Sequence, residues 1–351
     1  MDNLAHALVG AALGRAVADR HVPRAAVIGA VVANMPDLAE LFTGYPGWSR
    51  PEFLLNHRGI THSLMGALVE VVALTVIVGL LVRRRDVKPP WHWVVTLVAV
   101  TLLSHLFMDW QGSYGWRPFL PWNATWYYLD WVAIADPFFW LVPLVALAWG
   151  ADRHWRPLSA TAVGCGLVFF IILRYVRGGG SVSSWVVPLC VIVVVIGVIG
   201  WIQFWFGPVR RQRAATVAVV LLALYAGAQA IVGHGRKREI REQAIHRFGS
   251  TATWAALTNV GEPFTWEAMV ASTDTVATDD WQAARNLKAP AVVRAVRDTP
   301  DGHAIAQFAR FLTARVDAKD STVYLWDARY ARGPTGGWAA AAILEMAARL
   351  E

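Results

Sequence analysis

His57-Arg58-Gly59-Ile60-Thr61-His62-Ser63 is a polar heptapeptide directly before an almost uninterrupted apolar run, Leu64–Val82. Such a run has the length of a helix that crosses a bilayer, which needs about 20 apolar residues. Two imidazoles, a guanidinium and two hydroxyl groups at the end of such a helix are costly to desolvate unless they have a use. The stretch therefore predicts a membrane helix with a polar functional site at its beginning.

Titratable residues occur at comparable places elsewhere in the first part of the chain. His6 opens the first apolar segment, Asp37 closes the second, and His105 and Asp109 end a fourth. A simple threading of the chain through a membrane brings these residues to one side. We therefore expect a metal site at the membrane surface, with these ligands: His6, Asp37, His57, His62, His105 and Asp109.

The composition is that of a membrane protein. The chain has 351 residues, of which 56% are hydrophobic and only 16% are charged, well to the apolar side of ordinary soluble domains. We predict an all-α polytopic membrane bundle over residues 1–233, with roughly six to eight spans. Two short segments, Leu4–Ala18 and Ala25–Met35, are expected to form a hairpin of half-length or tilted helices inside the bundle. The longer candidate spans are Leu64–Val82, Trp91–Met108, Trp131–Trp149, Leu158–Leu173, Trp185–Phe206 and Ala214–Val232.

Basic residues indicate how the chain crosses the membrane. The formal net charge of +7 would suit a nucleic acid, but the arginines lie in short loops, where the positive-inside rule explains them. We therefore expect no nucleic-acid partner. This topology places the candidate site on the extracytoplasmic side. The loops expected to be cytoplasmic carry Arg15, Arg20 and Arg24; Arg83, Arg84, Arg85 and Lys88; Arg153 and Arg156; and Arg210, Arg211 and Arg213.

Neither the first residues nor the cysteines suggest a secreted disulfide protein. The start has no basic stretch and Arg15 interrupts its apolar run, so we expect no cleaved signal peptide. Cys165 and Cys190 both lie in apolar blocks and are typical of small buried side chains. Imidazoles and carboxylates remain as the candidate metal ligands.

The composition changes at about His234, where charged residues return and apolar runs shorten. Phe264–Val270 and Thr322–Tyr330 alternate as strands do, whereas His303–Arg315 has helical spacing and Ala339–Leu350 is typical of a terminal helix. We predict a soluble α+β domain over residues 234–351, on the extracytoplasmic side, with no catalytic residues of its own.

A tryptophan-rich loop follows His105 and Asp109. Its glycines and prolines predict a series of turns. The loop is either an aromatic belt at the lipid headgroups or a lid over an amphiphilic substrate. Asp130 and Asp136 follow it. Asp136 precedes Pro137, where an acid can serve simply as a helix cap, so its role stays open. The tryptophans are Trp110, Trp116, Trp122, Trp126 and Trp131.

The candidate ligands suit a divalent cation. His105 and Asp109 are four residues apart and share one helix face. Gly59 permits a turn, and Thr61 is expected to cap the next helix, so that His57 and His62 can both point at the site. Imidazole and carboxylate without thiolate favour Zn²⁺, or else Mn²⁺ or Fe²⁺. The set exceeds the roughly three protein ligands of one catalytic zinc, so we expect one or two ions, with Asp37 or Asp109 bridging two.

These motifs, taken in order, resemble the YdjM-like family of bacterial inner-membrane metal-dependent hydrolases. The resemblance covers the first 140 residues or so, and the family is remotely similar to the zinc-dependent phospholipase C and P1 nuclease group. It implies phosphoester hydrolysis at an inner membrane, with His6, Asp37, one or both of His57 and His62, His105 and Asp109 as ligands. The motifs are Met1-Asp2-Asn3-Leu4-Ala5-His6, Pro36-Asp37, the heptapeptide 57–63, His105-Leu106-Phe107-Met108-Asp109 with Ser113-Tyr114-Gly115, and Asp130-Trp131 with Asp136-Pro137.

We therefore predict a membrane-bound hydrolase in which a metal-activated water attacks a phosphoester of a lipid or another amphiphile. Arg58 and Asp109 are the candidate catalytic residues, although Arg58 could equally be an interfacial cation. Thr61, Ser63, Asp130 and Asp136 are candidates for supporting these groups. The alternative is a non-enzymatic membrane protein, a transporter or an envelope-integrity factor, in which the same residues bind metal or protons. A receptor or scaffold would instead use the C-terminal domain. The oligomeric state stays open.

Overall fold

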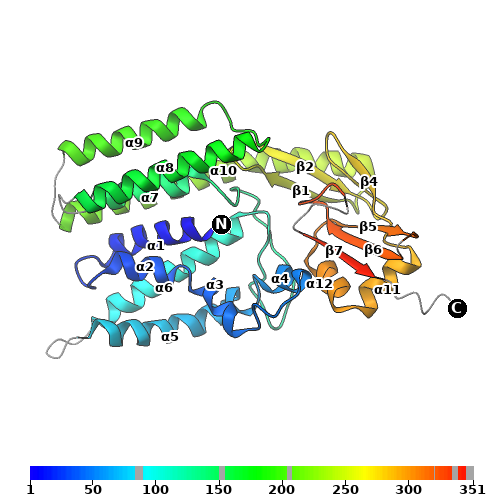
Figure 1. The fold of residues 1–351 in the computed structure, drawn as a ribbon, viewed down its shortest axis with the longest axis horizontal. Coiled ribbons are helices and arrows are strands. Elements are labelled where there is room, and N and C mark those ends of the chain that lie inside the picture. The colour runs from blue at the N-terminus through cyan, green and yellow to red at the C-terminus, as the bar shows by residue number, and fades with distance from the viewer. Residues whose placement is uncertain (84–89, 150–154, 204–207, 320, 334–338, 345–351) are drawn as a thin grey trace. The chain divides into compact units, whose positions relative to one another are not determined.

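Apolar helices fill the earlier part of the chain, and strands with short helices fill the later part (Figure 1). The computed structural model describes residues 1–351 except 84–89, 150–154, 204–207, 320, 334–338 and 345–351. By their contacts, the residues form two units. Unit 1 comprises Met1–Leu38, Thr61–Val232 and Thr258–Thr265. Unit 2 comprises Ala39–Ile60, Gly233–Leu257 and Trp266–Glu351.

Four helices are long and apolar enough to cross a membrane, counted over the described residues. They are α5 (Leu64–Val82), α6 (Trp91–Gln111), α8 (Trp155–Arg177) and α10 (Pro208–Phe248). The pair Ala25–Val32 and Met35–Phe42 adds a fifth if it is counted as one bent span. Two apolar helices are shorter, α7 (Pro137–Ala148) and α9 (Val186–Gln203). The predicted helical membrane part is confirmed, but the six to eight predicted spans compare with four or five helices of spanning length among the described residues. Most of the basic loop residues between Arg83 and Arg153 that we used for the topology lie outside the described residues.

The apolar blocks predict the bounds of one helix correctly and the start of another wrongly. Helix α5 has the predicted bounds, Leu64–Val82. The block Trp131–Trp149, in contrast, becomes helical only at Pro137. The Asp136 carboxylate accepts a hydrogen bond from the Phe138 N–H, 2.9 Å away, and proline is well suited to a first helical turn. Asp136 is therefore a helix cap, and residues 131–136 belong to the preceding loop.

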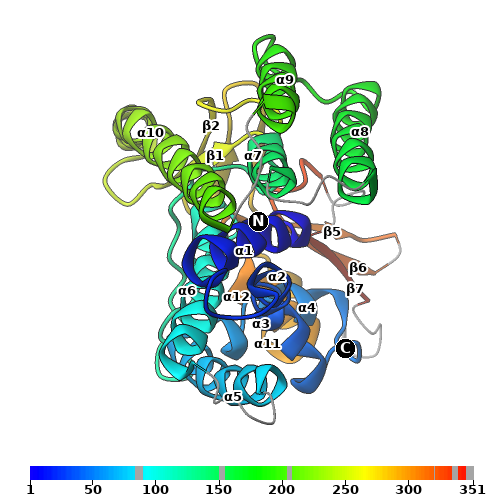
Figure 2. The same ribbon diagram turned by 90° about the vertical axis from the view of Figure 1, so that its left-hand side faces the viewer.

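The N-terminal hairpin is unusually tight. Helix α1 (Asn3–Ala18) and α2 (Ala25–Val32) cross through glycines, because a Cβ on Gly29 would lie 2.2 Å from the Gly10 carbonyl oxygen. A Cβ on Gly14 would lie equally close to the Ala25 carbonyl. Backbones can approach this closely only where side chains are absent. Helix α1 also packs against α6 and α7, so that it lies inside the bundle (Figure 2).

The heptapeptide 57–63 ends in a different cap from the one expected. Thr61 lies in a 3₁₀ turn, η2 (Ile60–His62), whereas Ser63 is the N-cap of α5 and accepts from the Gly66 N–H. The prediction that Thr61 caps the helix was therefore wrong. The 3₁₀ turn keeps Thr61 out of the cap position and leaves its hydroxyl, 3.0 Å from His62 Nδ1, to contact that imidazole.

Unit 2 is an α+β unit with two antiparallel sheets. One sheet has the order β1-β2-β3-β4, from β1 (Thr253–Thr258), β2 (Trp266–Ala271), β3 (Thr275–Ala277) and β4 (Gln282–Ala284). The other has the order β5-β6-β7, from β5 (Leu312–Asp317), β6 (Thr322–Asp327) and β7 (Ala340–Leu344). Helices α11 (Pro290–Asp298) and α12 (Pro300–Phe308) pack against this second sheet. Helix α4 (Arg50–Asn56) packs on α12, and the Ser49 hydroxyl donates to Asp301.

Two helix predictions in unit 2 were wrong. The segment His303–Arg315 is helical only to Phe308, and Leu312 already pairs with Asp327 in the sheet. The segment Ala339–Leu350 forms strand β7 over Ala340–Leu344, in register with β6, and its last residues lie outside the described part. In both cases pairing with β6 outweighs local helix propensity, which is worth only tenths of a kcal/mol per residue.

Candidate metal centre

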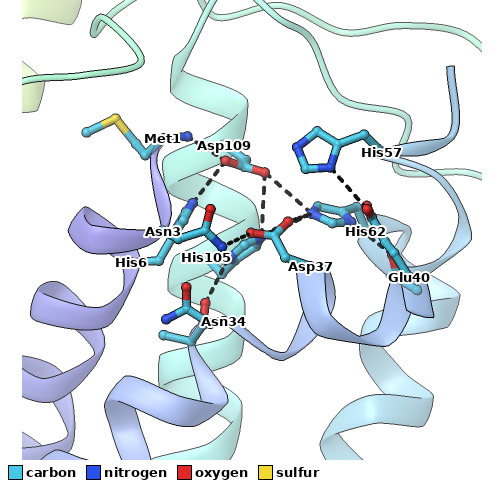
Figure 3. A network of polar contacts seen from close by, with 12 residues as sticks. Met1, Asn3, His6, Asn34, Asp37, Glu40, His57, His62, His105 and Asp109 are labelled. Carbon is cyan, nitrogen blue, oxygen red and sulfur yellow. Dashed lines mark hydrogen bonds and ion pairs between the residues drawn. The ribbon is translucent and has the colours of Figure 1, made fainter. Parts of the chain in front are cut away.

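Three imidazoles and two carboxylates from separate segments of unit 1 converge at one place (Figure 3). His105 and Asp109 project from α6, and His62 projects from η2. His6 comes from α1, and Asp37 comes from α3 (Met35–Ala39). The three imidazoles and Asp109 are at most 2% exposed. The structure thus brings together five of the six predicted metal ligands.

Four donor atoms lie at the separations that a small cation requires. The Nε2 atoms of His62 and His105 are 3.0 Å apart. Asp37 Oδ1 lies 3.2 Å from His62 Nε2 and 3.8 Å from His105 Nε2. Asp109 Oδ2 lies 3.5 Å from each of the same two nitrogens. Bonds of about 2.0–2.2 Å in a tetrahedral zinc site place ligand atoms roughly 3.3–3.6 Å apart. The five measured separations are close to the edges of such a site.

His6 approaches the second oxygen of Asp109. Its Nε2 lies 3.1 Å from Asp109 Oδ1, and its ring stacks on His105 with the centroids 3.8 Å apart. The Met1 amino group donates to the same oxygen at 2.5 Å. Asp109 therefore presents one oxygen to His62 and His105 and the other to His6 and Met1.

The hydrogen bonds on the far side of the rings fix which nitrogen faces the centre. His105 Nδ1 lies 2.7 Å from the Ala33 carbonyl oxygen, which can only accept, so the proton of the neutral ring belongs on Nδ1. In the neutral ring, His105 Nε2 is then a lone pair aimed at His62 Nε2. Burial lowers the pKa of His62 to about 4, so that ring is also neutral at pH 7.

Lone pairs and carboxylate oxygens that face one another repel unless a proton or a cation lies between them. Asp37 Oδ1 is buried, and no hydrogen-bond partner is found for it among the described residues. When the imidazoles are neutral, the two carboxylates are opposed only by the Met1 amino group in this cluster of described residues, and negative charge is left at a buried place. By their chemistry and spacing, these residues fit a divalent cation such as Zn²⁺.

Local sequence positions each ligand. Asp2 caps α1 by accepting from the Ala5 N–H, which places His6 in the first turns of that helix. The α2–α3 break at Ala33 and Asn34 turns Asp37 toward His62, and the Asn3 amide donates to the second Asp37 oxygen at 2.8 Å. The glycine contacts of α1 with α2 hold these two segments together.

The tryptophan-rich loop is attached to the centre. Trp116 Nε1 donates to the His62 carbonyl oxygen at 2.5 Å, and the Leu64 N–H donates to the Pro118 carbonyl oxygen. A bridge between Trp116 and Tyr127 closes the loop. At its tip Trp122 is 74% exposed, so different parts of the loop support the centre and face the surroundings.

The supporting residues of unit 1 have separate places. Asp130 is buried in the loop and has a left-handed backbone, with φ +46°. Asp136 caps α7 and accepts a hydrogen bond from the Tyr225 hydroxyl at 2.7 Å. Burial raises the pKa of Asp136 to about 6.

His57 and Arg58 belong to unit 2, whereas His62 belongs to unit 1. His57 ends α4, and its Nδ1 lies 3.1 Å from Glu40 Oε2 of the same unit. Its ring stacks on Phe53. Arg58 is buried, at 2% exposed. The two residues are thus described within unit 2, and their roles as ligand and catalytic group stay predictions.

Sequence reasoning missed three residues that hold the centre: Asn3, Ala33 and Trp116. Asn3 precedes a predicted helix and carries a polar side chain that could have been noticed. The contact of Ala33 is made by its carbonyl, which every residue has, and Trp116 was only one tryptophan among five. Sequence alone does not single out either.

Comparison with known proteins identifies the family to which the chain belongs. A protein of Bacillus subtilis (strain 168) described as "Uncharacterized protein YfhP" is 34% identical over 96 residues, which are 27% of this chain and 28% of that relative. The match thus spans little more than a quarter of that protein. No solved structure matches the chain. A family model described as YdjM inner membrane protein matches residues 1–235, which contain all six predicted ligands. The chain therefore belongs to the YdjM inner membrane protein family.

Proposed function

We propose that the protein is a membrane-bound, metal-dependent hydrolase of a phosphoester in a lipid or another amphiphile. The observation that carries this proposal is the approach of His62 Nε2, His105 Nε2, Asp37 Oδ1 and Asp109 Oδ2 to within 3.0–3.8 Å in the pairs measured. A set of imidazoles and carboxylates at this spacing is typical of hydrolytic metal sites.

Each residue has a distinct role in this proposal. Asp37, His62, His105 and Asp109 hold Zn²⁺, and Asp109 Oδ1, with His6, is the place for a second ion if there are two. A bound Zn²⁺ would supply a Lewis acid and lower the pKa of water to near neutrality. The Ala33 carbonyl and Trp116 keep His105 and His62 oriented. Arg58 is the proposed group for the phosphate charge.

The membrane supplies the substrate in this proposal. Helix α5 begins and α6 ends at the centre, which is expected to lie near the lipid headgroups because both helices are long enough to span. Exposed Phe119 and Trp122 of the attached loop suit that boundary. We propose that this side is extracytoplasmic and that the membrane is the bacterial inner membrane.

The test is hydrolysis by the purified full-length protein in nanodiscs that contain phospholipid, with and without added Zn²⁺. We expect zinc-dependent release of the phosphate-bearing headgroup, lost in His105→Ala and Asp109→Ala. The matched control is His303→Ala, because His303 is an exposed histidine of unit 2 that contacts Gln307. Metal analysis accompanies the assay: the wild type should carry zinc and the two centre variants should not.

A transporter would give a different result from the same variants. It would show zinc or proton flux across sealed vesicles that depends on His105 and Asp109, without hydrolysis. Wild-type protein that binds no divalent metal would contradict the proposal at its root.

A further inference from the structure

Glu70 is an acidic residue within the largely apolar helix α5. It lies on the inward side of that helix, because Ala67, Leu74 and Val78 share its face and are all buried. The residues beside it face outward, with Leu68 61% and Val69 60% exposed. Its carboxyl group therefore points into the bundle and not into lipid.

The surroundings of Glu70 do not satisfy a carboxylate. Its Oε2 atom is buried, and no hydrogen-bond partner is found for it among the residues that the structure describes. A carboxyl group inside a membrane-spanning helix is costly when it lacks a partner. Half-buried Glu70 therefore has one buried oxygen that a nearby cation would stabilise.

Glu70 lies close to the candidate metal centre along the chain of helix contacts. It is about two helical turns beyond Ser63, the N-cap that follows His62, and α5 packs against α6, which carries His105 and Asp109. From this place its charge acts through space on His105 and Asp37. No hydrogen bond or ion pair joins it to either of them in the described part of the chain, so it lies outside the ligand set. A negative charge at this place attracts a cation held between His105 and Asp37.

We propose that Glu70 is an outer carboxylate of the metal centre, which raises its affinity for a divalent cation without coordinating that cation directly. The cation supplies the counter-charge that the protein does not. This inference rests on the metal-binding part of the proposed function and is independent of hydrolysis.

The test is a Zn²⁺ titration of the full-length protein in nanodiscs, in competition with a chromogenic chelator. A carboxylate that acts only through space contributes by Coulomb attraction, and we expect Glu70→Gln to weaken zinc binding several-fold at unchanged stoichiometry. Glu70→Asp, which keeps the charge, should recover part of the affinity. Thr75→Val is the matched control, since Thr75 is a buried polar residue of the same helix whose hydroxyl likewise has no partner among the described residues. It should bind zinc as the wild type does.

Melting of the metal-free protein separates this role from a structural one. A structural Glu70 would make Glu70→Gln melt lower, whereas an outer carboxylate predicts equal or higher melting, because an unsatisfied charge is removed. Wild-type affinity in Glu70→Gln, or an equal loss in Thr75→Val, would overturn the inference. Zinc binding with this dependence on Glu70 but without hydrolysis would reject only the proposed reaction. A wild type that binds no zinc would reject both.

Discussion

Each unit buries carboxylates, but the two units balance them in opposite ways. In unit 2, Asp327 is fully buried and meets the equally buried Arg329 at 2.6 Å. The backbone N–H groups of Arg310 and Arg329 donate to it as well. In unit 1, Asp37 and Asp109 face the imidazoles of His62 and His105, and Asp109 also meets the Met1 amino group at 2.5 Å. The Arg329 guanidinium, which is always charged, neutralises Asp327. The site in unit 1 instead has carboxylate charge and imidazole lone pairs that can bind a cation.

The difference teaches that burial alone does not identify a functional acid. Asp327 is as buried as Asp109, yet its hydrogen bonds come from the Arg329 guanidinium and from backbone N–H groups, which do not bind metal cations. The carboxylates of the candidate centre are held by groups that can also bind metal. Substitutions in the two sites should therefore separate metal binding from stability.

The largest expected effect is at Asp109. Asp109→Asn keeps the shape but removes the charge from a group that contacts His6, His62 and His105. We expect zinc in purified protein to fall from about one or two ions per chain to none, as measured by elemental analysis. The contrast is Asp327→Asn, which should keep the metal and lower the melting temperature of unit 2. Equal zinc in Asp109→Asn and the wild type would remove Asp109 from the ligand set.

The next largest effect concerns the Asp327–Arg329 ion pair of unit 2. Arg329→Met leaves Asp327 buried without its counter-charge, and breaking a buried pair in this way costs about 3–5 kcal/mol. Chemical denaturation followed by tryptophan fluorescence should show unit 2 unfolding earlier, while zinc affinity stays unchanged. The matched control is Arg315→Met, whose partner Asp317 is 29% exposed, so the loss should be below about 1 kcal/mol. A zinc loss in Arg329→Met would mean that the sites are not independent.

A third prediction concerns the hairpin that carries His6 and Asp37. Gly29→Val must separate α1 from α2, because its Cβ would lie 2.2 Å from the Gly10 carbonyl oxygen. Overpacking of this kind costs about 1–3 kcal/mol and shifts Ala33, so we expect lower melting and weaker zinc binding together. Gly166→Val in α8 is the control, since nothing lies within 4 Å of its added Cβ. Equal behaviour of the two variants would argue against the hairpin as the support of the centre.

The sequence predicts the parts of the centre that follow from helix geometry. His105 and Asp109 share a face because they are four residues apart, and the run Leu64–Val82 fixes α5 by its length. It does not predict contacts that depend on how segments pack. Thr61 and Ser63 are both suitable caps, and only the 3₁₀ turn decides between them.

The same limit explains the errors outside the centre. Ala339–Leu350 has the composition of a helix, but pairing with β6 is a long-range effect that local propensity cannot show. His57 and His62 stand in one heptapeptide, yet the chain passes from unit 2 to unit 1 between them. His57 pairs with Glu40, which no spacing rule would select.

The smallest expected effect tests whether the tryptophan-rich loop supports the candidate metal centre. Trp116→Phe keeps an aromatic ring in place but removes the Nε1–H that donates to the His62 carbonyl oxygen at 2.5 Å. A hydrogen bond of this kind contributes about 1 kcal/mol, so zinc affinity should fall several-fold, with the number of bound ions unchanged. Trp122→Phe is the control, because Trp122 is 74% exposed and should bind zinc like the wild type. If both variants weaken binding equally, the loop acts through its contact with lipid and not through His62. If only Trp116→Phe does so, the orientation of the His62 imidazole depends on a hydrogen bond from outside the ligand set. The Asp327–Arg329 pair needs no such support, because each side chain is the partner of the other.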